Sequence, residues 1–301
     1  MRVFVTGASG FIGSAVVAEL LGAGHEVVGL ARSDESAAAL AVAGAGVHRG
    51  ALDDLDSLRE GATASEGVIH LAYQHDFVDM VAAADDDLRA VQAMCEVLEG
   101  TDKPFTTATG TLGLVFGYPT PLGRTGTEDD VPELSGPRIN TENALATFAQ
   151  RGVRTSVVRL APTVHGEDDH GFVPRLIAIA RDKGASAFVG DGANRWPAVH
   201  RLDAARLFRL ALESAPAGSR LHGVADEGVQ FRSIAEAISR HLDVPVVSVS
   251  PQEAEDHFGF LGFLVQLDNP TSSQLTQERL GWQPTHAALI ADLDEGHYFN
   301  V

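Results

Sequence analysis

A glycine-rich turn near the N-terminus has the residue types and spacing that a dinucleotide pyrophosphate requires. Residues 6–13 read Thr-Gly-Ala-Ser-Gly-Phe-Ile-Gly and follow a short apolar run at residues 3–5. Gly7 permits a tight turn, Gly10 lets the backbone approach a phosphate, and Gly13 allows a helix to pack closely on the strand. The amides and partial positive charge at the start of that helix attract an anion. We therefore expect a dinucleotide to bind at this turn.

The elements that must hold this turn in place recur along the first half of the chain. Apolar runs at residues 3–5, 27–30, 67–72, 104–109 and 156–160 alternate with amphipathic helical stretches. Continuous apolar runs between helices indicate a parallel sheet that is covered on both faces. The expected fold class is therefore α/β, with a doubly wound parallel sheet of the Rossmann type.

After about residue 165 the pattern changes. Residues 200–212 predict a helix and residues 221–224 a strand that joins the edge of the sheet, whereas the segments from residue 231 onward predict a smaller lobe. We place a dinucleotide-binding domain at residues 1–165, with residues 190–225 returning to it. Residues 166–189 and 226–301 form a C-terminal substrate lobe. The cleft between the sheet and the lobe is the expected site.

Composition excludes several other classes of function. The formal net charge of −19 argues against binding to nucleic acid or to an anionic membrane surface. No run approaches the ~18 apolar residues that a membrane span needs. Cys95 is the single cysteine, so no internal disulfide and no metal–thiolate cluster is expected, and His/Cys ligand spacing is absent, so no metal is expected.

Two further expectations concern the cellular location of the protein and the start of one helix. The N-terminal residues run directly into a strand and leave no room for a leader, so we expect a cytoplasmic protein. Three successive aspartates at residues 85–87 suit the positive end of a helix dipole, and a helix is expected to begin there.

The spacing of the glycines resembles the T-G-x-x-G-x-x-G turn of extended short-chain dehydrogenases/reductases, the NAD-dependent epimerase/dehydratase-like type. Stretches at residues 70–72, 159–166, 190–200 and 280–284 are similar to further segments of that superfamily, in the same order. The resemblance covers nearly the whole chain. It implies a nicotinamide cofactor and a small-molecule substrate.

The end of the second predicted strand favours NADP over NAD. Enzymes of this fold that use NAD usually present a carboxylate there, whereas this chain has Arg32 and Ser33, which suit a 2′-phosphate. An aspartate that family members often carry near Ala51 is absent, which leaves the adenine contact to Leu52 or Asp53. The residues expected to bind the cofactor are Thr6, Gly7, Ser9, Gly10, Phe11, Ile12, Gly13, Arg32, Ser33, Leu52, Leu71, Ala72 and Pro162.

The catalytic residues that the resemblance implies are only partly present. Members typically use a Ser or Thr after the fifth strand and a Tyr-x-x-x-Lys dyad on the next helix. The corresponding stretch here is residues 138–142, and no tyrosine lies between residues 118 and 298, nor any lysine between residues 103 and 183. The dyad is missing, which identifies the chain as an atypical member.

Other side chains are candidates for the same chemistry. Arg138 and Glu142 are spaced i, i+4, so Arg138 either faces the cleft and binds a carbonyl or carboxylate, or forms a surface ion pair with Glu142. Histidines at the mouth of the cleft, His75 and His170, are suitable proton donors near neutral pH. The candidates for catalysis are Thr109, Thr111, Arg138 and His75.

Two functions of different classes remain. The first is an NADP-dependent oxidoreductase, or an epimerase-like enzyme, that acts on a carbonyl-like group and takes its proton from a group other than the usual tyrosine. The second is a non-catalytic NADP-binding sensor or regulatory protein. A cleft containing Phe172, Trp196 and several histidines favours the enzyme, whereas exposed apolar residues near 258–264 would favour a partner or a homodimer.

Overall fold

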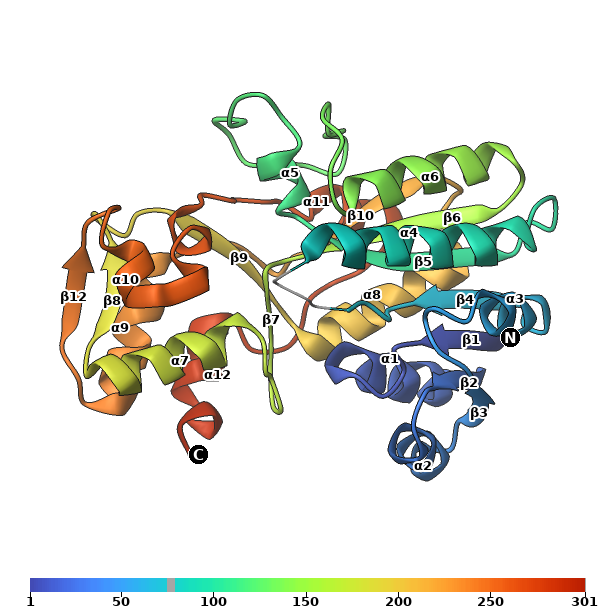
Figure 1. Ribbon diagram of the computed structural model, residues 1–301, viewed down its shortest axis with the longest axis horizontal. Helices are drawn as coiled ribbons and strands as arrows, with labels where there is room; N and C mark the ends of the chain where they lie inside the picture. The colour runs from blue at the N-terminus through green and yellow to red at the C-terminus, as the bar shows by residue number, and fades with distance from the viewer. Residues whose placement is uncertain (75–78, 301) are drawn as a thin grey trace.

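The computed structural model describes residues 1–74 and 79–300, and a seven-stranded sheet dominates it (Figure 1). The strand order is β10-β6-β5-β4-β1-β2-β3, and every neighbouring pair is parallel. Its strands are β1 (Arg2–Thr6), β2 (Glu26–Ala31), β3 (Gly46–Arg49), β4 (Gly67–His70), β5 (Pro104–Gly110), β6 (Arg154–Leu160) and β10 (Ser219–Gly223). The order reverses between β1 and β4, and ligands of doubly wound sheets bind beyond the carboxyl ends of the strands at such a switch point. The doubly wound α/β prediction is confirmed.

Alternate side chains of each strand enter cores on opposite faces of this sheet. Val3 and Val5 pack in one core with α1, α2 and α8, whereas Phe4 packs in the other with α3, α4 and α6 (Figure 1). The bounds are α1 (Phe11–Gly22), α2 (Asp34–Ala43), α3 (Leu55–Thr63), α4 (Met80–Glu96), α6 (Ile139–Gln150) and α8 (Arg201–Ser214). Burial on both faces explains why the strands read as continuous apolar runs.

A second group of elements forms its own core at the left of Figure 1. Two small sheets are made from β7 (Thr163–His165), β9 (Arg195–His200) and β11 (Asp226–Gln230), and from β8 (Ser186–Val189) and β12 (Val246–Val249). The helices are α7 (Phe172–Lys183), α9 (Phe231–Leu242), α10 (Ala254–Phe258) and α12 (Leu289–Asp294), with the 3₁₀ helices η1 (Gly259–Leu261), η2 (Leu264–Gln266) and η3 (His297–Phe299). The remaining helices are α5 (Gly113–Phe116) and α11 (Gln274–Leu280).

Trp196 belongs to this second core and not to a cleft. Its ring is 1% exposed and lies between Phe172 and Phe231, with ring centroids 5.7 and 5.1 Å away. The expectation that Trp196 lines the cleft is therefore wrong, because its large apolar area is used to hold α7 and α9 against β9. Trp282, which follows α11, packs instead in the core beneath α8. The division into residues 1–165 with 190–225 and the remaining lobe stays a prediction.

Three local elements differ from expectation. The edge strand β3 was not predicted, and β4 ends at His70, two residues earlier than expected. Helix α4 begins at Met80, where the carboxylate of Asp79 accepts a hydrogen bond from the amide of Ala82 at 2.9 Å. The aspartates at residues 85–87 therefore lie inside the helix, and the side chain of Asp87 is completely buried.

Two surface properties bear on partners. In the described part of the chain no helix combines the length and the apolarity that crossing a bilayer demands. Of the apolar segment near residues 258–264, Phe258 and Leu261 are buried, whereas Phe260 and Phe263 are 53% and 64% exposed. Phe263 stacks against Phe116 with ring centroids 6.1 Å apart.

Candidate functional site

The glycine-rich turn joins β1 to α1 and is shaped by two crowded glycines. Gly7 has a φ of +66°, and a Cβ placed there would lie 2.6 Å from the amide nitrogen of Ala72. A Cβ on Gly13 would lie 1.9 Å from the carbonyl oxygen of Gly7. Gly10 is the N-cap of α1, and no side chain bonds to the amides at this end of the helix. The turn therefore presents uncapped amide donors, with Ser9, Gly10, Phe11 and Ile12 accessible to solvent in whole or in part.

Two basic side chains lie beside the same helix end. The guanidinium of Arg201 lies 5.1 Å from the centroid of the Phe11 ring, and the imidazole of His170 lies 5.6 Å from it. Both come from segments that follow β7 and β9, far along the chain from α1. The charge of the Arg201 guanidinium adds to the partial positive charge of the α1 N-terminus. These described residues fit an anionic pyrophosphate, although the protein as a whole is strongly acidic.

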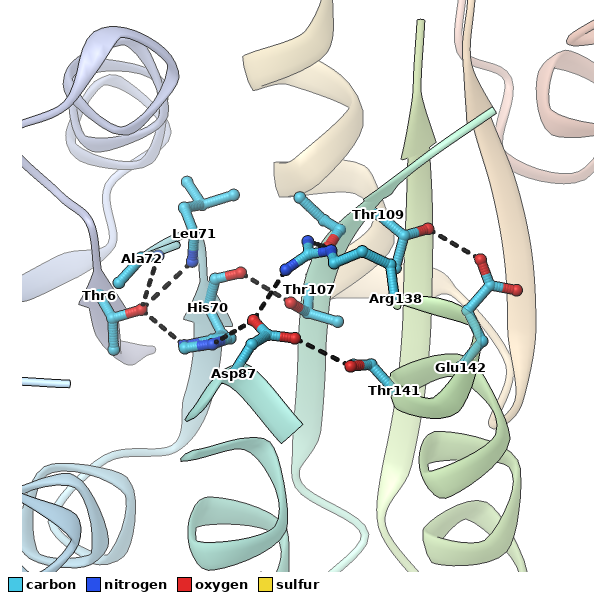
Figure 2. A network of polar contacts seen from close by, with 11 residues as sticks. Thr6, His70, Leu71, Ala72, Asp87, Thr107, Thr109, Arg138, Thr141 and Glu142 are labelled. Atoms are coloured by element: carbon cyan, nitrogen blue, oxygen red, sulfur yellow. Dashed lines mark hydrogen bonds and ion pairs between the residues drawn. The ribbon is translucent and has the colours of Figure 1, made fainter. Parts of the chain in front are cut away.

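Thr6 connects the turn to the end of β4. Its Oγ1 accepts hydrogen bonds from the amides of Leu71 and Ala72, each at 3.2 Å, and lies 2.7 Å from Nδ1 of His70 (Figure 2). Because both lone pairs of Oγ1 are used, its hydrogen is left for Nδ1 of His70. The other ring nitrogen of His70 then carries a hydrogen toward Asp87, whose Oδ1 is 3.3 Å away. The backbone of residues 71–72 is thus fixed against the glycine turn.

Asp87 is the centre of this polar network. Besides His70, it accepts hydrogen bonds from Nη1 of Arg138 and from Oγ1 of Thr141, both at 2.8 Å (Figure 2). Burial would raise the pKa of Asp87, but the charge of Arg138 and the hydrogen bonds hold that pKa below its ordinary value. Asp87 is therefore a buried carboxylate that stays ionised at neutral pH.

Arg138 lies at the carboxyl end of β5, between that strand and α4. It is the N-cap of α6, with a φ of +65°, and its Nη2 donates to the carbonyl oxygen of Ala108. Its guanidinium stacks on the ring of Tyr73, 4.2 Å from the centroid, and its side chain is 22% exposed. Within residues 1–74 and 79–300, two of its five N–H groups are used in the hydrogen bonds to Asp87 and Ala108, which leaves three for other acceptors.

The expected ion pair between Arg138 and Glu142 does not form. Glu142 points the other way, toward Arg159, whose Nε and Nη2 donate to it at 3.0 and 2.7 Å (Figure 2 shows Glu142 facing Thr109). Arg138 precedes the first helical residue with a left-handed backbone, so the i, i+4 geometry of a continuous helix does not apply to it. The surface-pair interpretation of Arg138 is therefore wrong, since its partner is the buried Asp87.

The two threonines expected to hold an oxyanion have different hydrogen-bond partners. Oγ1 of Thr109 donates to Glu142 at 2.8 Å, so its hydrogen is already committed. Oγ1 of Thr111 accepts from Nδ2 of Asn269 at 2.8 Å and keeps its own hydrogen for a further acceptor. Both hydroxyls are buried, Thr111 completely.

The remaining predicted cofactor residues lie at the ends of other strands. Arg32 is exposed directly after β2, and Ser33 is the N-cap of α2, where its hydroxyl accepts from the amide of Ser36 at 3.1 Å. Leu52 follows β3 and packs against the core under α3, and Pro162 links β6 to β7. A carboxylate does lie nearby, Asp34, but its charge is paired with Arg49.

Two further predictions concern His75 and the absence of a metal site. His75 lies outside the described residues. Near the C-terminus, Asp292, Glu295 and His297 bring potential ligand atoms within 4.8 Å of one another. One oxygen of Asp292 is already bonded to His165 and Tyr298. The absence of a metal centre stays a prediction.

Sequence reasoning missed two residues of this site, Tyr73 and Asp87. Tyr73 carried a usable signal, because it directly follows the stretch at residues 70–72 that resembles a cofactor-lining segment. Asp87 carried none, since its partner Arg138 is 51 residues away and only the fold brings the two together.

The comparisons with known proteins agree with this geometry. The model of the NAD dependent epimerase/dehydratase family matches residues 3–222, more than half of the chain. The chain belongs to this family.

Two relatives match this chain over almost its entire length. An uncharacterized protein of Schizosaccharomyces pombe is 52% identical over 300 residues, covering 99% of this chain and 100% of its own. One of Saccharomyces cerevisiae is 46% identical over 304 residues, covering 100% of both. More distant relatives carry epimerase, dehydrogenase and reductase names, so the family relationship supports an enzymatic role.

Solved structures show the same fold. UDP-glucose 4-epimerase of Thermotoga maritima superposes with a TM-score of 0.77 at 21% identity, covering 99% of this chain and 98% of its own. At that identity the likeness concerns the fold. The sheet and the glycine-rich turn are those of the epimerase/dehydratase family. Arg138 and Glu142 lie in the stretch that the sequence analysis matched to the family's Tyr-x-x-x-Lys dyad.

Proposed function

We propose that this chain is an NADP-dependent oxidoreductase that reduces a carbonyl-like group on a small molecule. The observation that carries the proposal is the position of Arg138. Asp87 and the carbonyl oxygen of Ala108 hold its guanidinium at the carboxyl ends of the neighbouring strands β4 and β5. Ligands of doubly wound sheets bind beyond these ends. A partly exposed cation with unused N–H donors at these ends is suited to a developing negative charge on oxygen.

The residues around the glycine-rich turn are proposed to bind and orient the dinucleotide. The uncapped amides of α1, together with Arg201 and His170, support binding of the pyrophosphate. The backbone of residues 71–72 is held beside the same turn by its hydrogen bonds to Thr6. A reduced nicotinamide, when bound, supplies a hydride for a carbonyl carbon. The protein then has to place the carbonyl and stabilise its oxygen.

Arg138 and Thr111 are the residues we assign to that oxygen. Thr111 still has a hydrogen to donate, whereas the hydrogen of Thr109 is held by Glu142. We therefore give Thr109 the supporting task of fixing Glu142 and Arg159 in place. The substrate is identified only by its chemistry, a carbonyl or imine that accepts a hydride.

Turnover of such a compound is the direct test. We expect the protein to oxidise NADPH in the presence of at least one member of a panel of aldehydes, ketones and cyclic imines, followed by absorbance at 340 nm. The Gly10→Val variant, which is expected not to bind the dinucleotide, serves as the inactive control. If NADPH binds and no compound is reduced, the non-catalytic sensor becomes the better account of this site.

Cofactor preference is tested separately. Arg32, the hydroxyl of Ser33 and the N-terminus of α2 support binding of a 2′-phosphate. We expect NADPH to bind at least tenfold more tightly than NADH. Arg32→Ala should remove that preference, since a hydrogen bond to a charged group contributes about 1.5–3 kcal/mol. Fluorescence titration of both cofactors measures this, with Arg240→Ala as a control distant from α2. Equal affinities in the wild type would contradict the assignment.

Location and assembly are further proposals of the same kind. We propose a cytoplasmic location because the chain has a single cysteine, Cys95, and therefore no internal disulfide. The exposed rings of Phe260 and Phe263 are candidates for a homodimer contact.

A further inference from the structure

The chain contains three tyrosines, and their surroundings separate them clearly. The hydroxyl of Tyr118 donates to the carbonyl of Val131 at 2.7 Å on the surface. The hydroxyl of Tyr298 is bonded to Gly166 and Asp292 within the second core. Of the three, Tyr73 is the one whose ring packs against Arg138 of the candidate site.

Tyr73 is placed there by its neighbours in the chain. It follows Ala72, whose amide is bonded to Thr6 beside the glycine turn. Its ring is half-buried, and the guanidinium of Arg138 lies 4.2 Å from the ring centroid. The phenol and the guanidinium therefore meet beyond the carboxyl ends of β4 and β5, next to the point between β1 and β4 at which the strand order reverses.

We propose that Tyr73 is the proton donor of the carbonyl reduction and that Arg138 stabilises the phenolate which this transfer leaves. The inference rests on the proposed function. The carbonyl carbon takes a hydride from the reduced nicotinamide, and the electron pair of the C=O π bond moves to the oxygen. The O–H bond of Tyr73 breaks and its proton forms the new O–H bond. Water then returns a proton to Tyr73.

The electrostatics of the pair suit this task. Burial raises the pKa of Tyr73, the charge of Arg138 lowers it, and that of Asp87 raises it, with a net shift upward. The hydroxyl is thus protonated at neutral pH. Attraction between Arg138 and a phenolate exists only after the proton has left. This interaction therefore favours the transition state over the ground state.

In this proposal Tyr73 and Arg138 take the roles of the tyrosine and the lysine of the missing dyad, although they come from different elements. In the family pattern a lysine lies beside the tyrosine on one helix, whereas here the cation comes from the N-cap of α6 and the phenol from the loop after β4. Asp87, with His70 behind it, holds the guanidinium against the ring. Arg138 itself stays protonated and is a poor proton donor.

The Tyr73→Phe variant tests the assignment, because phenylalanine keeps the ring that packs on Arg138 and removes only the hydroxyl. With the compound that the wild type reduces, kcat should fall at least a hundredfold, which is the scale of general acid catalysis. The Kd for NADPH and the unfolding midpoint should stay unchanged. In the wild type kcat should decline at alkaline pH as Tyr73 loses its proton, and this limb should be absent from the variant. Tyr118→Phe is the matched control and should behave as the wild type.

The outcomes distinguish this inference from the function on which it rests. A wild type that reduces no compound removes the proposed function, and this role with it. A wild type that is active, together with a Tyr73→Phe variant within threefold of its kcat, overturns only the role of Tyr73. Loss of NADPH binding in the variant would also overturn it, because the residue would then serve binding and not proton transfer.

Discussion

Replacing Gly10 with valine is expected to abolish dinucleotide binding while the protein remains folded. Gly10 has an ordinary φ of −78°, and a Cβ built on it meets only the carbonyl oxygen of Gly7, at 3.2 Å. The fold therefore has room for a side chain there after a small adjustment. The space above the turn is the space that a pyrophosphate needs, and a valine would occupy it.

The other two glycines do not allow this separation of binding from folding. A side chain on Gly13 would overlap the backbone of Gly7, and one on Gly7 would require a left-handed backbone and overlap Ala72. Substitutions at these positions would damage the contact between β1, α1 and the residues after β4. Loss of binding there would not identify a ligand site, whereas loss at Gly10 would.

The measurement is calorimetric titration of NADPH into the folded variant. We expect the affinity to fall at least a hundredfold, which corresponds to ~2.7 kcal/mol or more. Gly22→Val is the matched control, since Gly22 ends the same helix and a Cβ there meets nothing within 4 Å. A Gly10→Val protein that binds NADPH within threefold of the wild type would remove the turn from the cofactor site.

The elements that the sequence predicted well are those whose signal is local. Strand β1 and helix α1 flank a turn whose three glycines each have a distinct steric task, and two of those tasks are visible as overlaps that a Cβ would create. The buried strands read as apolar runs because both of their faces are covered. Strand β3 gave no such signal, since its sequence Gly-Val-His-Arg has one large apolar residue and the strand lies at the exposed edge of the sheet.

The polar residues of the candidate site were less predictable because their partners are distant in sequence. Asp87 was interpreted as part of an acidic helix start, yet the fold buries it opposite Arg138. An ion pair with Glu142 was one of two alternatives considered for Arg138, yet Glu142 pairs with Arg159 on the neighbouring strand. In both cases a helix is present but begins at a different residue from the one the pattern implied, and the tertiary arrangement decides which charges meet.

Replacing Arg138 with leucine is expected to reduce both stability and turnover, and the structure explains why the two effects must be separated. The variant would leave the carboxylate of Asp87 buried, with His70 and Thr141 as its remaining partners. Removal of one member of a buried ion pair costs about 3–5 kcal/mol. This loss of stability is far larger than the few tenths of a kcal/mol that a surface ion pair between Arg138 and a helix neighbour would contribute.

A second variant separates the charge at Asp87 from the chemistry of Arg138. Arg138→Leu combined with Asp87→Asn removes the uncompensated carboxylate and keeps polar atoms next to Thr141 and His70. Urea unfolding should show that the double variant regains a large part of the stability lost by Arg138→Leu. The kcat for NADPH-dependent reduction should stay low in both variants, because neither has a cation beside Tyr73 or the substrate oxygen.

Comparing the two variants decides what Arg138 does. If stability returns and kcat does not, the guanidinium acts on the reacting groups, since the same fold without it is inactive. If kcat returns together with stability, Arg138 only neutralises Asp87, and the oxyanion must be held by Thr111 and its neighbours. Asp87→Asn alone is the necessary third measurement. It removes the ion pair while Arg138 itself is kept, so a kcat close to that of the wild type would show that the charge of Asp87 is not needed for turnover and would leave the chemistry to Arg138.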